Sequence, residues 1–127
     1  MANELILIVE DNEKNLKLVR DLLQFKGYRT VDATTGEEGV AQAAQHIPDL
    51  ILMDYQLPGI DGIEAFRRIR GEAATAHIPI LAVTASAMPE QARQMKEAGF
   101  DGFQSKPINV KEFLQAVATV LEARTAS

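Results

Sequence analysis

Polar side chains that could carry out phosphoryl chemistry stand directly after short apolar runs at four places in this chain. They comprise three carboxylates, a hydroxyl and an ammonium group: Glu10, Asp11, Asp54, Thr84 and Lys106. If the apolar runs are parallel strands of one sheet, their carboxyl ends meet at one edge, where open α/β sheets bind ligands. The sequence therefore predicts that these side chains converge on one metal-assisted phosphoryl site.

The residue types at this edge suggest a division of labour. Three converging carboxylates repel one another unless a cation joins them, and Mg²⁺ is the hard ion that oxygen ligands and phosphate favour. A carboxylate such as Asp54 can act as a nucleophile and form an acyl phosphate. Phosphoryl transfer then needs the moving oxygens neutralised, which Lys106 and Thr84 could help to do. A cis peptide between Lys106 and Pro107 is expected to aim the lysine inward, because X-Pro bonds carry only a small cis penalty.

These residues would be positioned by an α/β domain, because apolar runs of strand length alternate with segments of helical period. The predicted strands, of which 29–33 is half-polar and expected at an edge, are residues 5–9, 29–33, 49–53, 78–83 and 100–104. Helices are predicted between them, one opening with a capping box at Thr35. The last opens at Asn109 with an apolar stripe formed by Val110, Phe113, Leu114, Val117 and Leu121. Five strand–helix units predict one domain over residues 4–123 and a short C-terminal tail over 124–127.

Composition excludes several other classes of function. The chain has 127 residues, of which 46% are hydrophobic and 24% charged, as expected of one globular domain. A net charge of −5 makes a direct nucleic-acid surface unexpected, since that needs a basic face. The absence of cysteine excludes disulfides and thiolate metal sites and suits a cytoplasmic location. Neither a signal peptide nor a membrane span is predicted, because the first apolar run is short and follows no basic segment.

Four stretches occur together in order, and with them the chain resembles the receiver domains of two-component response regulators over about residues 4–123. They are Ile-Val-Glu-Asp-Asn at 8–12, Leu-Met-Asp-Tyr-Gln-Leu-Pro at 52–58, Val-Thr-Ala at 83–85 and Ser-Lys-Pro at 105–107. The resemblance implies a flavodoxin-like (βα)5 doubly wound sandwich whose five-stranded parallel sheet has the order 2-1-3-4-5.

By the same resemblance, Glu10 and Asp11 hold Mg²⁺ together with Asp54 and the backbone carbonyl of Gln56. Asp54 accepts the phosphoryl group from a histidine kinase or a histidine phosphotransfer protein. Thr84 and Lys106 bind the phosphoryl oxygens. Such a domain is a signalling phosphoprotein that catalyses only its own phosphorylation and slow autodephosphorylation.

The resemblance also implies an output mechanism. Phe103 matches the aromatic switch residue, which turns inward as Thr84 is drawn toward the phosphate. It has no hydroxyl group where many relatives carry tyrosine, so only steric gating is expected. The surface around the predicted helix 89–99, strand 100–104 and last helix would contact a downstream protein target, and a phosphorylation-dependent dimer stays open. Gln56 and Ser86 occupy the positions that tune the phosphoryl lifetime.

Three other readings compete with a stand-alone receiver. A haloacid-dehalogenase-type phosphatase also uses an aspartyl nucleophile, but it needs a second aspartate where this chain has Gln56. A flavodoxin-type nucleotide or flavin module needs a phosphate-cradling loop after the first strand, where residues 10–13 are acidic instead. A receiver fragment of a hybrid histidine kinase would share every motif, and the stop codon in the source gene separates that reading from the stand-alone one.

Overall fold

Strands and helices alternate along the chain in the computed structural model, which describes residues 4–54, 57, 59–84, 89–105 and 109–126. The strands are β1 (Leu5–Val9), β2 (Arg29–Ala33), β3 (Leu50–Asp54), β4 (Ile80–Thr84) and β5 (Gly102–Ser105). The helices are α1 (Glu13–Phe25), α2 (Gly36–His46), α3 (Gly62–Gly71), α4 (Pro89–Ala98) and α5 (Val110–Ala126). This confirms the predicted α/β class.

The strands form one parallel sheet in the order β2-β1-β3-β4-β5, so the expected strand order is confirmed. The order reverses between β1 and β3, which lie side by side although β2 separates them in sequence. Val9 at the end of β1 is in register with Met53 in β3. The carboxyl ends of these two strands therefore lie together at the point where a doubly wound sheet binds its ligand.

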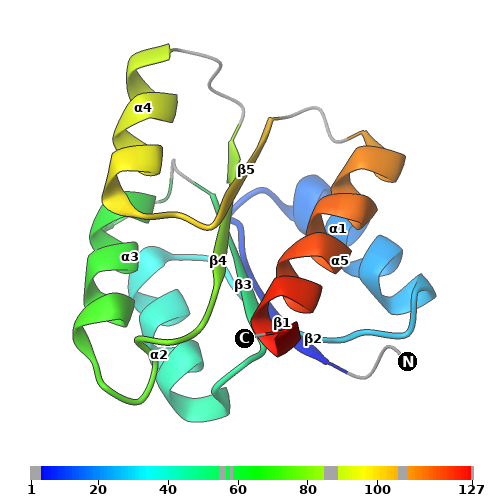
Figure 1. Ribbon diagram of the computed structural model, residues 1–127, viewed down its shortest axis with the longest axis horizontal. Coiled ribbons are helices and arrows are strands. Elements are labelled where there is room, and N and C mark those ends of the chain that lie inside the picture. Colours follow the sequence, from blue (N-terminus) through cyan, green and yellow to red (C-terminus); the bar gives the residue numbers. More distant parts are fainter. Residues whose placement is uncertain (1–3, 55–56, 58, 85–88, 106–108, 127) are drawn as a thin grey trace.

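Helices cover both faces of the sheet, with α1 and α5 on one face and α2, α3 and α4 on the other (Figure 1). Alternate residues of β1 face opposite layers, since Ile6 and Ile8 belong to the core beneath α1 and α5, and Leu7 and Val9 to the other core. All four are at most 2% exposed. Burial on both faces explains why the central strands read as unbroken apolar runs.

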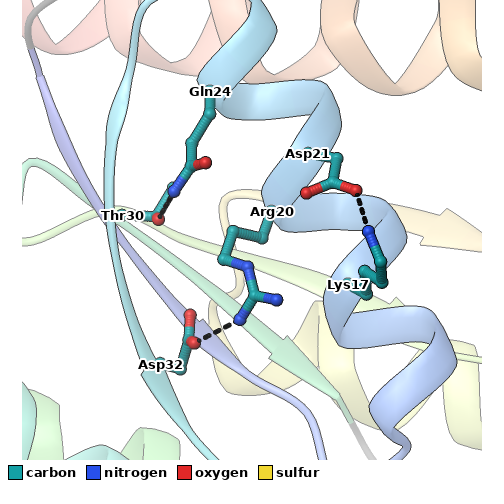
Figure 2. Close-up of polar contacts among 6 residues, drawn as sticks. All are labelled: Lys17, Arg20, Asp21, Gln24, Thr30 and Asp32. Carbon is teal, nitrogen blue, oxygen red and sulfur yellow. Dashed lines mark hydrogen bonds and ion pairs between the residues drawn. The ribbon is translucent and has the colours of Figure 1, made fainter.

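The edge strand β2 is more polar, and α1 supplies partners for its polar side chains. Arg20 of α1 forms an ion pair with Asp32 at 2.9 Å, and the Gln24 side-chain amide donates to the Thr30 hydroxyl at 3.0 Å (Figure 2). Thr30 and Asp32 are in register with Ile6 and Ile8 of β1, so they share the face that α1 covers. These contacts let a half-polar strand pack under a helix.

Side-chain caps fix where four of the helices begin. Asn12 accepts from the backbone N–H of Asn15 at the start of α1, and Asn109 accepts from that of Glu112 at the start of α5. The other two caps are Thr35 before α2 and Asp61 before α3, each accepting from the N–H three residues on. Capping of this kind satisfies donors that the first helical turn leaves unpaired.

Several predicted boundaries are corrected by the structure. Strand β4 begins at Ile80 and not at residue 78, because Pro79 has no N–H to donate to the ladder and Ile78 donates to a turn carbonyl instead. β3 and β5 both begin and end one or two residues later than predicted. Val110 is 46% exposed, so the buried stripe of α5 starts one turn later, at Phe113. The helix α5 continues to Ala126.

Candidate metal and phosphoryl site

Three carboxylates meet at the carboxyl ends of β1 and β3. Oxygen atoms of Glu10, Asp11 and Asp54, one from each residue, all lie within 4.8 Å of one another. Asp54 is the last residue of β3, and Glu10 directly follows β1. Because Val9 and Met53 are register partners, the chain places Glu10 and Asp54 next to each other. The predicted convergence of these acids is confirmed.

Glu10 is buried and is held by the backbone around it. It is only 4% exposed, and its N–H donates to the carbonyl of Ala33 at 2.9 Å, which extends the pairing of β1 with β2. Its Oε2 accepts from the N–H of Asn12 at 3.1 Å, while Asn12 itself caps α1. The turn that ends β1 and begins α1 is thus organised around this carboxylate.

Asp54 is almost as buried, with 6% of its surface exposed, whereas Asp11 is exposed. A small cavity of about 10 Å³ lies beneath the acids, lined by Ile8, Val9, Glu10, Val19, Leu52, Asp54 and Val83. Most of its wall is apolar, so the two buried carboxylates stand between the packed core and the edge of the sheet. A low-dielectric floor strengthens electrostatic interactions at these carboxylates.

This donor set fits a hard divalent cation. Three carboxylates in reach of one another offer only oxygen ligands, which Mg²⁺ prefers to nitrogen or sulfur. Two of them are buried, and a cation bound there interacts strongly with them because the local dielectric constant is low. The cluster could therefore hold a metal through Glu10, Asp11 and Asp54.

For two further predicted site residues, Thr84 and Phe103, the structure gives the position within a strand. Thr84 is the last residue of β4 and is in register with Ser105, while Phe103 of β5 is in register with Ala82. The threonine therefore ends its strand at the same edge of the sheet as Asp54, whose register partner is Val83. The remaining predicted residues, Gln56, Ser86, Lys106 and Pro107, lie outside the described residues.

The sequence interpretation missed one contact near the site. The first turn of α2 packs against the segment that follows Asp54, where the Glu37 carboxylate accepts from the N–H of Ile60 at 3.4 Å. Its neighbour Gly36 approaches Ile60 so closely that no side chain would fit between them. The stretch from Thr35 was interpreted as a helix cap, which is correct but says nothing about a contact made 23 residues away.

Comparison with known proteins places this architecture in one family. The family model of the response regulator receiver domain matches residues 6–118 of this chain. The polar-differentiation response regulator DivK of Brucella ovis is 41% identical over 116 residues, which span 91% of this chain and 94% of that protein.

Two solved structures are similar over nearly their whole length. One is the receiver domain of a sensor histidine kinase from Pseudomonas aeruginosa PAO1, with a magnesium ion coordinated in its active-site cleft. It is 32% identical with a TM-score of 0.88, and the match covers 95% of this chain and 99% of that one. The other is a CheY-like receiver domain protein from Methanospirillum hungatei JF-1, 27% identical with a TM-score of 0.91, covering 98% of both chains.

The doubly wound parallel sheet, the acidic residues at its carboxyl edge and these matches together identify a signalling domain of the two-component class. The chain belongs to the response regulator receiver domain family. The comparisons support neither the phosphatase nor the flavin-binding alternative. No helix in the described part of the chain combines the length and the apolar character needed to cross a membrane.

Proposed function

We propose that this receiver accepts a phosphoryl group on Asp54 from the phosphohistidine of a histidine kinase or phosphotransfer protein. The observation that supports this most directly is the meeting of Glu10, Asp11 and Asp54 within 4.8 Å at the carboxyl edge of the sheet. Asp54 ends a strand that is buried throughout, so its backbone is fixed while its carboxylate faces the cluster. A nucleophile held in one place removes much of the entropic cost of the reaction.

In the reaction, a carboxylate oxygen of Asp54 forms a bond to phosphorus as the bond from phosphorus to the histidine nitrogen breaks. The electron pair of that bond stays on the imidazole, and Asp54 becomes an acyl phosphate. Glu10, Asp11 and Asp54 would hold Mg²⁺, which supplies positive charge to the phosphoryl oxygens. Thr84 and Lys106 are proposed to bind the remaining oxygens, the first as a hydroxyl donor and the second as a fixed cation.

The output follows from a population shift between two conformations. After phosphorylation a group of about −1.5 to −2 charges stands where the Asp54 carboxylate carried −1, and only a state that contacts this group differently can gain population. Thr84 is proposed to move toward the phosphoryl group and Phe103 to turn inward, which changes the surface of α4, β5 and α5. A downstream protein target would read that surface, as the family resemblance implies.

Other parts of the sequence interpretation stay predictions. These are the domain limits 4–123, the cytoplasmic location, the roles of Gln56 and Ser86 in lifetime tuning, and the cis peptide before Pro107. That the receiver acts alone rather than within a hybrid kinase also stays a prediction.

The proposal is tested by incubating the chain with acetyl phosphate and Mg²⁺ and measuring the intact mass. We expect one added phosphoryl group on the parent protein and none on Asp54→Asn. Asp11→Ala should lose both the labelling and its dependence on Mg²⁺. An unmodified parent, or equal labelling of Asp54→Asn, would overturn the proposed function. A transfer profile against phosphorylated histidine kinases would then identify the physiological donor.

A further inference from the structure

We propose that the first turn of α2 is a positioning element for the acidic cluster, acting through Gly36, Glu37 and Gly39. These residues contact Gly59, Ile60 and the end of β1, fix α2 against them, and thereby set the affinity for Mg²⁺. This inference rests on the proposed function, since it concerns the same metal site. It assigns a role to a helix that contributes no carboxylate to the cluster.

Gly36, the first residue of α2, contacts the segment that follows Asp54. A Cβ atom built on Gly36 would lie 2.5 Å from the backbone carbonyl oxygen of Ile60 and 2.5 Å from its Cγ1 atom. The carbonyl oxygen belongs to the backbone and cannot turn aside as a flexible side chain could. Any larger residue at position 36 must therefore displace the Ile60 backbone or the first turn of α2.

Gly39 makes the equivalent contact with β1. Its Cβ would lie 2.9 Å from Cγ2 and 3.0 Å from Cγ1 of Val9, the residue directly before Glu10. Residues three apart lie on one face of a helix, so Gly36 and Gly39 present a single surface without side chains. One face of α2 thus contacts both Ile60 and Val9, the residue before Glu10.

Glu37 adds a polar tether at the same place. Its Oε1 atom accepts from the N–H of Ile60 at 3.4 Å and would clash with a Cβ atom built on Gly59. Gly59 has φ of +77°, a conformation that glycine adopts without strain. The carboxylate therefore covers a left-handed turn, two residues before Asp61 caps α3.

These contacts connect α2 to metal affinity because Gly39 touches Val9, the residue before the proposed ligand Glu10, and Gly36 lies on the same face of the helix. Partners that orient a metal ligand without binding the metal typically change affinity by about 10- to 100-fold when they are removed. We expect Gly36→Ala to lower Mg²⁺ affinity about 10-fold. Alanine is the better helix former, so a change in helix propensity alone would not predict this loss.

The test is a Mg²⁺ titration by calorimetry on the parent and matched variants, with circular dichroism and thermal unfolding in EDTA as folding controls. Gly71→Ala is the matched control, because a Cβ there would meet no atom within 4 Å. We expect Gly36→Ala and Glu37→Ala to bind Mg²⁺ more weakly, while Gly71→Ala binds as the parent does. Glu37→Gln keeps the acceptor oxygen and is expected to restore affinity to near the parent value.

The possible outcomes separate this inference from the proposed function. A parent that binds Mg²⁺ and is labelled by acetyl phosphate, while Gly36→Ala and Glu37→Ala both titrate like it, would overturn the inference alone. A parent that neither binds Mg²⁺ nor accepts the phosphoryl group would overturn both. If Gly36→Ala fails to fold, the comparison of Glu37→Ala with Glu37→Gln decides, since this pair differs in the tether and not in the packing of the glycine face.

Discussion

The carboxylate cluster should destabilise the fold when no metal is bound, and Asp54→Asn should therefore raise the free energy of unfolding. Asparagine keeps the shape of the side chain and removes its charge. Two like charges at 4.8 Å repel by about 3.5 kcal/mol at an effective dielectric constant of about 20. Asp11 is exposed, so salt screens its charge and weakens its repulsion of Asp54. We therefore expect Asp54→Asn to raise the free energy of unfolding by about 1–3 kcal/mol, which is less than full repulsion from both Glu10 and Asp11 would give.

Urea unfolding followed by circular dichroism measures this difference, since the chain has no tryptophan for fluorescence. In EDTA, the variant should unfold at the higher urea concentration. Adding Mg²⁺ should stabilise the parent by about 1.4 kcal/mol for a concentration roughly tenfold above its dissociation constant. The variant should respond far less, so the gap between the two proteins should narrow or close as Mg²⁺ is added.

A matched control and a refuting result make this prediction decisive. Asp21→Asn removes the same charge from the exposed surface of α1, where Lys17 is the partner, and should not raise stability in EDTA. If Asp54→Asn were no more stable than the parent in EDTA, repulsion among the three acids would not be a significant term. The three acids would then not require a cation to join them.

Three further outcomes are expected. Thr84→Ala should still be phosphorylated but should lose the change at α4, and amide NMR shifts there that match the phosphorylated parent would contradict the proposed coupling. Burial, with the charges of nearby glutamates, raises the pKa of Tyr28, so the folded state keeps its proton longer and parent stability should fall above about pH 10. Between about pH 9 and about pH 11, Tyr28→Phe should lose less stability to urea than the parent does. An equal loss of stability in the two proteins would exclude Tyr28 as the cause. Asp101→Ala removes the acceptor for Arg70 and for the N–H of Ile80, and should lower the free energy of unfolding by about 1–2 kcal/mol, whereas an unchanged urea midpoint would show the pair to be neutral.

Local chemistry explains why much of the fold could be predicted from the sequence. The run 5–9 is uniformly apolar because β1 is buried on both faces, so both its ends are visible in the sequence. Helix starts such as Thr35 and Asn109 are encoded by a side chain and a backbone N–H only three residues apart. The site acids could be grouped for a related reason, since parallel strands bring their carboxyl ends to a common edge whatever lies between them.

Contacts between distant segments were not predictable in the same way. Glu37 and Ile60 are 23 residues apart, and Arg70 and Asp101 are 31 apart. Nothing in the composition around these residues distinguishes them from an ordinary solvated surface. Strand β4 was placed two residues too early for a different reason, because hydrophobicity alone does not register that Pro79 cannot donate to a sheet.

The distribution of these distant contacts limits where the receiver can move. Asp101, just before β5, pairs with Arg70 at 2.8 Å and accepts from the N–H of Ile80 at 2.8 Å, and its own N–H donates to the Ile80 carbonyl. Arg70 also lies over the ring of Phe66, with its guanidinium carbon 4.9 Å from the ring centroid. The amino ends of β4 and β5 are therefore fixed to each other and to α3. A change that starts at Asp54 is expected to be absorbed at the opposite, carboxyl ends of these strands, where Thr84 ends β4.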